Sequence, residues 1–184
     1  QYLGSDALAI YGPISNVSTF VQCCAYSVGQ ASQPIISTNF GAGKEARIRK
    51  TLRYALWTVV FFGVFWTAPS VACLNLYIRI FMSPTETILA MAPAIIRAYA
   101  ISFLLLPFNI FSTYYFQAIL QPKAAFIVSV ARGLVISGAL ILMLPLLAGA
   151  DSLWFAMPIT ELVTAVYAAA CIRRYTARLD AKAT

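Results

Sequence analysis

Long apolar segments separated by short polar turns constrain this chain more than any other feature of its sequence. Five such segments lie at about 8–40, 52–81, 86–120, 123–147 and 152–178. A helix rises about 1.5 Å per residue, so about 20 apolar residues cross the roughly 30 Å hydrocarbon core of a bilayer. The sequence therefore predicts an all-α integral membrane protein, a bundle of about five transmembrane helices that forms one unit over residues 1–184.

The composition supports a membrane protein. Hydrophobic residues make up 61% of the chain and charged residues only 10%, whereas about a quarter of a soluble protein is charged. The net charge of +7 would suggest nucleic acid as the partner of a soluble protein. Here the basic residues lie mainly at the ends of the apolar segments, so we expect membrane lipid and no nucleic acid as partner.

The basic residues also predict an orientation. Ten of the 13 Lys and Arg residues lie in the first turn, in the third turn and in the C-terminal tail: Lys44, Arg47, Arg49, Lys50, Arg53, Lys123, Arg173, Arg174, Arg178 and Lys182. If the spans alternate, these three places lie on one side of the membrane, and the opposite turns hold only Arg79. Because positive residues are retained in the cytoplasm, we expect a multi-pass protein of the plasma (inner) membrane with a cytoplasmic C-terminus.

Nothing in the sequence indicates an enzyme or a metal site. The chain has no histidine, the commonest general base and metal ligand. Its four cysteines lack the spacing of metal ligands. We therefore expect no catalytic residues and no cofactor.

The first apolar segment carries a stripe of polar side chains at three- and four-residue spacing, which places them along one side of a helix. The stripe consists of Asn16, Thr19, Cys23, Tyr26, Gln30, Gln33 and Ser37. A stripe of this length should not face lipid. It either lines a water-filled cavity that binds a cargo molecule or makes hydrogen bonds between helices, and the sequence leaves both interpretations open.

The third segment ends in a second polar and aromatic patch, formed by Asn109, Ser112, Thr113, Tyr114, Tyr115, Phe116 and Gln117. Aromatic rings and amides together could form a binding wall for flat, apolar cations. The alternative is an aromatic belt at the membrane interface, which we favour for Tyr114 and Tyr115.

Three charged residues lie well inside the apolar segments, away from their ends: Arg97, Arg132 and Glu161. Each costs about 2.5–3.5 kcal/mol at the centre of a bilayer on insertion scales, so a charged partner is expected. Counted from the outer turns, Arg97 and Glu161 differ in depth by about 5 Å, which an arginine side chain can bridge. Arg132, on the neighbouring helix, is the alternative partner. The pair is either structural or a switch whose pairing changes when an ion or a proton binds.

Three motifs resemble the multidrug and toxic compound extrusion (MATE) transporters. The first is residues 29–43, GQASQPIISTNFGAG, followed by the basic segment KEAR. The second is YFQA at residues 115–118 with Arg132 in the next span, and the third is WFAMPITE at residues 154–161. Together the motifs cover most of the chain, and their order is that of the family.

The resemblance implies the C-terminal lobe, spans eight to twelve, of a two-lobe transporter with twelve helices. Because the chain begins with Gln1, without a leading Met, we expect a piece of a longer protein whose N-terminal lobe is a partner. The resemblance further implies efflux of organic cations or amphipathic compounds in exchange for Na⁺ or H⁺. Some members use carboxylates in spans seven and ten for ion coupling. Residues 86–120, which correspond to span ten, contain no acidic residue after Glu86 at their start. We therefore expect the coupling-ion site to lie largely outside this chain.

The sequence leaves two other functions open. One is a flippase for lipid-linked saccharides from the same superfamily, which should have several basic residues in its cavity. The other is a membrane scaffold without transport activity, which should have fully paired polar stripes and no open groove. We expect the residues of the substrate cavity to be Asn16, Thr19, Tyr26, Gln30, Gln33, Asn109, Thr113 and Gln117.

Overall fold

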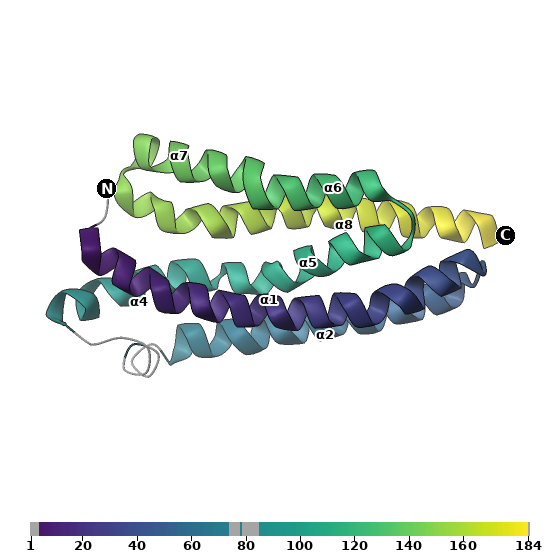
Figure 1. Cartoon of the computed structure of the whole chain (residues 1–184), viewed down its shortest axis with the longest axis horizontal. Helices are drawn as coiled ribbons and strands as arrows, with labels where there is room; N and C mark the ends of the chain where they lie inside the picture. The colour runs from purple at the N-terminus through teal and green to yellow at the C-terminus, as the bar shows by residue number, and fades with distance from the viewer. Residues whose placement is uncertain (1–3, 74–77, 79–84, 184) are drawn as a thin grey trace.

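The computed structural model describes residues 4–73, 78 and 85–183, and every element among them is helical (Figure 1). The helices are α1 (Gly4–Gly41), α2 (Glu45–Ala72), α4 (Glu86–Ala100), α5 (Ser102–Ala118), α6 (Pro122–Val130), α7 (Ile136–Ala148) and α8 (Ala156–Ala183). A π-helical turn, Ala131–Val135, joins α6 to α7, and a 3₁₀ segment, Ala150–Phe155, precedes α8. The predicted all-α fold is confirmed.

Four helical segments among the described residues are long and apolar enough to cross a membrane. They are Glu45–Ala72, Ile88–Ala118, Pro122–Ala148 and Ala150–Arg178. Helix α1 is 38 residues long but is not among these four. Helix α2 begins at Glu45, seven residues before the expected start of that span. The expected end of the span near residue 81, with Arg79, lies outside the described residues.

The third span is interrupted between α4 and α5 at Ile101. Its two internal prolines, Pro93 and Pro107, lie within α4 and α5 and not at this break. Hydroxyl groups donate to carbonyl oxygens at the interruption, Ser102 Oγ to Tyr99 at 2.6 Å and Thr67 Oγ1 to Ala100 at 3.4 Å. Such side-chain bonds allow a helix to be broken within a membrane bundle.

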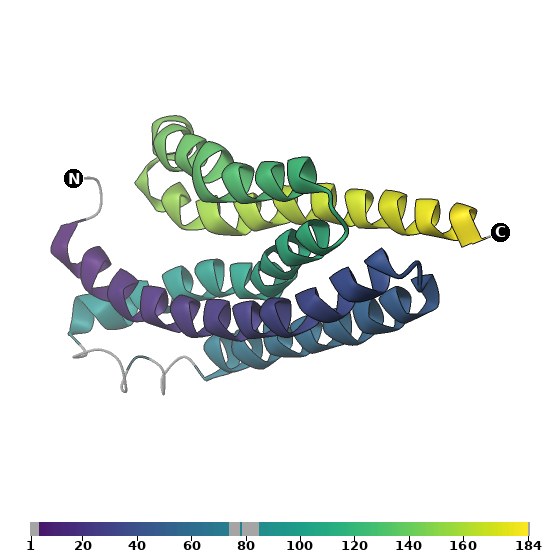
Figure 2. The same ribbon diagram turned by 45° about the vertical axis from the view of Figure 1, so that its right-hand side comes forward.

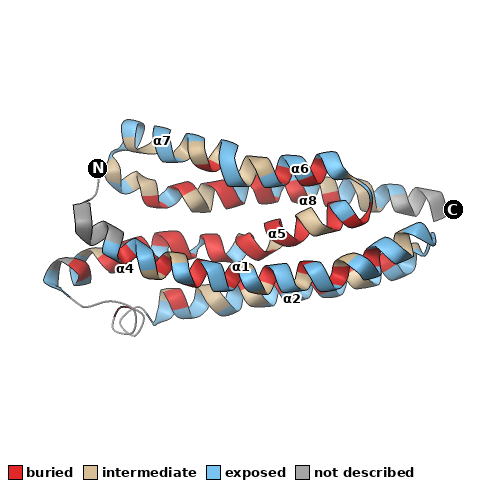
Figure 3. Ribbon diagram, viewed as in Figure 1, coloured by how far each residue is buried: buried red, intermediate tan, exposed pale blue. Residues whose placement is uncertain are grey.

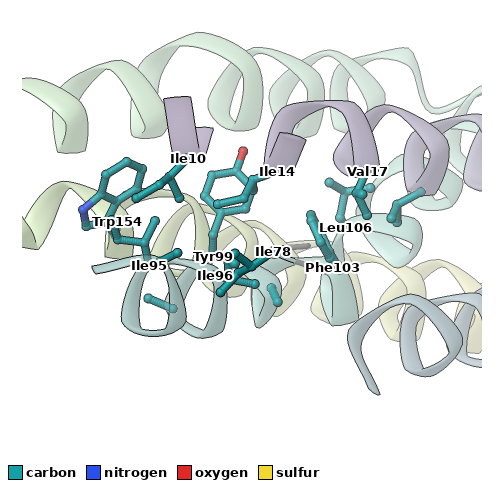
Figure 4. Close-up of a cluster of buried hydrophobic side chains, with 14 of the residues drawn as sticks. Ile10, Ile14, Val17, Ile78, Ile95, Ile96, Tyr99, Phe103, Leu106 and Trp154 are labelled. Atoms are coloured by element: carbon teal, nitrogen blue, oxygen red, sulfur yellow. The ribbon is translucent and has the colours of Figure 1, made fainter. Parts of the chain in front are cut away.

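Helix α5 lies at the centre of the bundle, and 11 of its 17 residues are buried. At one end, its Phe103 and Leu106 belong to a hydrophobic cluster with residues of α1 and α4 that extends as far as Trp154 (Figure 4). At the other end, Phe111 and Tyr115 pack with the end of α1 and with α2, α6 and α8. Both hydrophobic clusters therefore contain residues of α5. This packing holds α5 in place, together with any functional side chain that it carries.

The outer surface of the bundle is largely apolar. Figure 3 shows exposed residues along the outer sides of α2 and α7, and among them are Trp57, Phe61, Leu142 and Leu147, between 60% and 79% exposed. Exposed apolar side chains of this size are expected where a helix contacts lipid. Figures 1 and 2 also show the α1–α2 turn, the α5–α6 turn and the C-terminus at the same end of the bundle, so the basic residues of these places share one end.

Candidate functional site

A cavity of about 340 Å³ lies between α1, α5, α6 and the π-helical turn. This volume falls within the range of small-molecule pockets. Two tyrosine rings, two amides, two hydroxyls, one isoleucine and one guanidinium group line it. These residues are Tyr26, Asn109, Ile110, Thr113, Tyr114, Gln117, Ser129 and Arg132.

A buried ion pair joins this cavity to α8. Arg132 Nε donates to Glu161 Oε1 at 2.7 Å, and Asn109 Nδ2 donates to Glu161 Oε2 at 2.6 Å. Asn109 Nδ2 also donates to the Glu161 carbonyl oxygen at 2.8 Å. Glu161 is 0% exposed, and each of its carboxylate oxygens has a donor. The three residues therefore tie α5, the π-helical turn and α8 together within the apolar interior.

Arg132 lies on the π-helical turn, whose wider hydrogen-bonding pattern is often found at functional sites. Its side chain is 19% exposed and also lines the cavity. Within the described part of the chain, only Nε of this guanidinium group has a hydrogen-bond partner. The two terminal nitrogens of Arg132 remain available to a molecule in the cavity.

Asn109 contributes a second unused polar group. It is 0% exposed, and its Oδ1 is buried without a hydrogen-bond partner among the described residues. A buried acceptor without a partner costs about 1–3 kcal/mol. The side chain is held in this orientation because its Nδ2 donates twice to Glu161.

The structure divides the predicted patch on α5 between two environments. Asn109, Thr113, Tyr114 and Gln117 line the cavity, while the other three residues, Ser112, Tyr115 and Phe116, are 0% exposed. The prediction of an interfacial aromatic belt is wrong for Tyr115, because this ring packs inside the bundle and its hydroxyl bonds Thr176 Oγ1 at 3.2 Å. It is also wrong for Tyr114, which lines the cavity and whose ring centroid lies 6.3 Å from that of Tyr26.

The polar stripe of α1 reaches the cavity at two places. Tyr26 lines it, and Gln33 Nε2 donates to Gln117 Oε1 at its edge, at 3.3 Å. The other predicted cavity residues of the stripe, Asn16, Thr19 and Gln30, are exposed on α1 but do not line this cavity. The Thr19 hydroxyl donates to the Ser15 carbonyl oxygen of its own helix at 3.0 Å.

Arg97 is not the partner of Glu161. It lies exposed on α4, whereas both oxygens of the Glu161 carboxylate are bonded by Arg132 and Asn109. The expectation based on depth in the membrane was wrong, because depth does not specify which side of a helix faces α8. In the structure, Glu161 pairs with the alternative partner, Arg132.

Four lining residues were not among the predicted cavity residues. Tyr114 and Arg132 were singled out in the sequence for other roles, whereas Ile110 and Ser129 were not singled out at all. Ser129 precedes Arg132 by three residues, a spacing that places two side chains on one face of a helix, so its position could have been found from that of Arg132. Ile110 has the same spacing from Thr113, but an isoleucine in an apolar helix carries no signal of a cavity.

The comparison with known proteins decides the family. The family model MatE matches residues 1–143. The chain belongs to the MatE family. MATE proteins are transporters and not enzymes, so the expectation of no enzymatic activity is confirmed at the level of the family.

The fold of this MATE chain is similar to that of a solved structure described as the outward-facing conformation of a multidrug resistance MATE family transporter of the MOP superfamily. The two share 14% sequence identity with a TM-score of 0.85, over 97% of this chain and 40% of the other. The chain thus spans two fifths of the length of that transporter. A search of curated protein sequences found no match to this chain. The family and the helices together show a multi-pass membrane protein.

Proposed function

We propose that this MATE chain is the C-terminal lobe, spans eight to twelve, of a secondary active multidrug exporter. The complete transporter would lie in the plasma (inner) membrane with its C-terminus in the cytoplasm. It would export organic cations or amphipathic compounds by antiport with Na⁺ or H⁺. The observation that carries the proposal is the 340 Å³ cavity lined by aromatic rings, amides and hydroxyls.

The exposed polar residues of α1 support a cavity that is larger than this lobe alone provides. Asn16 and Gln30 are exposed on the same helix as Tyr26, and hydrocarbon cannot satisfy their side-chain amide groups. A companion lobe facing α1 across water would satisfy them. The family resemblance of this chain supplies such a lobe, the N-terminal half of the transporter.

The cavity also favours export of small molecules over the two alternatives. A flippase for lipid-linked saccharides should hold pyrophosphate with several basic residues, but Arg132 is the one basic residue among the described lining residues. A scaffold should have fully paired polar stripes and no open groove, whereas α1 exposes Asn16 and Gln30.

We propose that the coupling ion binds at a site that lies largely outside this chain. The described residues that line the cavity include no carboxylate. Glu161 is fully buried behind Arg132 and Asn109, which occupy both of its oxygens. The cluster acts either as a structural ion pair or as a switch that opens during ion exchange. Replacing Glu161 by glutamine tests this, because unchanged coupled transport would assign it a structural role.

Efflux of ethidium from cells that express the complete transporter tests the proposed function. The Na⁺ and H⁺ gradients are collapsed separately, and cells that carry the empty vector are the control. We expect efflux to stop when one of the two gradients is lost, which identifies the coupling ion. Ethidium retention that is independent of both gradients, with the protein present in the membrane, would contradict an exporter of organic cations.

A further inference from the structure

We propose that Arg132 makes this lobe selective for amphipathic cargo that carries a carboxylate beside a flat aromatic body. The selectivity rests on the proposed function, because it describes the cargo of the same cavity. It narrows the cargo from organic cations in general to aromatic acids and zwitterions.

The charge of the cavity wall supports an anionic group. Arg132 is the one charged residue among the described lining residues. Its counter-charge, Glu161, is 0% exposed and bonds the Nε side of the guanidinium group. The positive end of this ion pair therefore faces the cavity and the negative end faces the interior of the bundle. An oxyanion in the cavity would contact the positive end directly, whereas a cation there would have no carboxylate to approach.

The geometry of Arg132 is suited to a carboxylate. A guanidinium group presents its donors in a planar fork that matches the two oxygens of a carboxylate. The bond from Nε to Glu161 at 2.7 Å fixes the plane of this fork. Side-chain entropy that is already lost in the free protein does not have to be lost on binding. The terminal nitrogens of Arg132 are thus both unused and held in place.

Other lining groups complete a receptor for such a molecule. The rings of Tyr26 and Tyr114 stand at 73° to each other with centroids 6.3 Å apart, which leaves an apolar wall for an aromatic body. The hydroxyl groups of Thr113 and Ser129 and the amide group of Gln117 also line the cavity and can bond polar groups of the cargo.

A matched pair of dyes tests the inference. A rhodamine with a free carboxyl group and the methyl ester of the same dye share one cationic ring system and differ in the carboxylate. Fluorescence anisotropy gives the affinity of each dye for the purified complete transporter. We expect the wild-type protein to prefer the free acid by roughly tenfold, the size expected for one hydrogen bond to a charged group.

Three variants separate the role of Arg132 from general charge and from folding. The double variant Arg132→Gln/Glu161→Gln removes both charges, so no unpaired charge remains buried, and should bind the two dyes equally. Arg132→Lys keeps the charge without the fork and should retain part of the preference. Lys123→Gln removes a charge from the same helical segment at an exposed position outside the cavity, and should behave like the wild type.

Equal binding of both dyes by the wild-type protein, or a stronger affinity for the ester, would overturn the inference. A preference for the acid that survives in the double variant would overturn it as well. The wild-type comparison needs no variant to fold. Gradient-driven efflux of both dyes at equal rates would contradict the proposed selectivity for a carboxylate but would still support an exporter. A preference in binding without gradient-driven efflux would support the selectivity and count against the exporter.

Discussion

Replacing Arg132 alone should destabilise the protein more than replacing Arg132 and Glu161 together. Glu161 is 0% exposed and bonds Arg132 Nε at 2.7 Å. The single variant Arg132→Gln leaves the buried carboxylate without a positive partner. In the double variant Arg132→Gln/Glu161→Gln, the two amides can bond each other and the carbonyl of the new side chain at 161 can still accept from Asn109.

The expected magnitudes follow from burial. Removing one partner of a buried ion pair typically costs about 3–5 kcal/mol. The bond from Asn109 Nδ2 at 2.6 Å remains in the single variant, so we expect the lower end, about 3 kcal/mol. Exchanging both charges for neutral amides replaces charged hydrogen bonds by neutral ones, at a cost of about 1 kcal/mol. The double variant should therefore be about 2 kcal/mol more stable than the single variant.

The free energy of unfolding of the complete transporter can be measured by denaturant titration in mixed micelles, followed by far-UV circular dichroism. Arg132→Gln, Glu161→Gln, the double variant and the wild type form one double-mutant cycle. Lys123→Gln is the control for loss of a basic residue at an exposed site and should lie within about 0.5 kcal/mol of the wild type. Equal losses in Arg132→Gln and the double variant would refute a coupled, buried pair.

Three further predictions concern packing and solvent. Gly63→Ala should lower the free energy of unfolding by about 1–3 kcal/mol, because the new Cβ would lie 2.7 Å from the Leu104 carbonyl oxygen. The control Gly138→Ala, whose Cβ would have nothing within 4 Å, should leave it unchanged. Equal melting temperatures of the two variants would contradict the close approach at Gly63. In a protein without its native cysteines, a membrane-impermeant maleimide should label Gln30→Cys on the polar stripe but not Phe61→Cys on the outer side of α2. Labelling of Phe61→Cys but not of Gln30→Cys would show that lipid covers the polar stripe. Tyr115→Phe should cost about 0.5–1.5 kcal/mol through its lost hydroxyl bond to α8, and an unchanged unfolding midpoint would show that this bond does not form.

Sequence patterns predicted the helical architecture well because they reflect local physics. The length of the apolar segments and the turns between them reveal the helices, whose backbone bonds are made within each segment. The break at Ile101 was not predicted, and Thr67 from α2 donates to the Ala100 carbonyl oxygen next to it at 3.4 Å. A contact between two helices leaves no trace in the periodicity of either one.

The candidate site shows the same division. Composition and spacing alone indicated a membrane bundle, a polar side of α1 and three charges that needed partners, because the cost of polar groups in hydrocarbon applies to each segment separately. Only the tertiary structure decided that Glu161 pairs with Arg132 and not Arg97. It also decided that Tyr115 is buried while the adjacent Tyr114 lines the cavity. These outcomes depend on which helix faces become neighbours, and that is set by the packing of the whole bundle around α5.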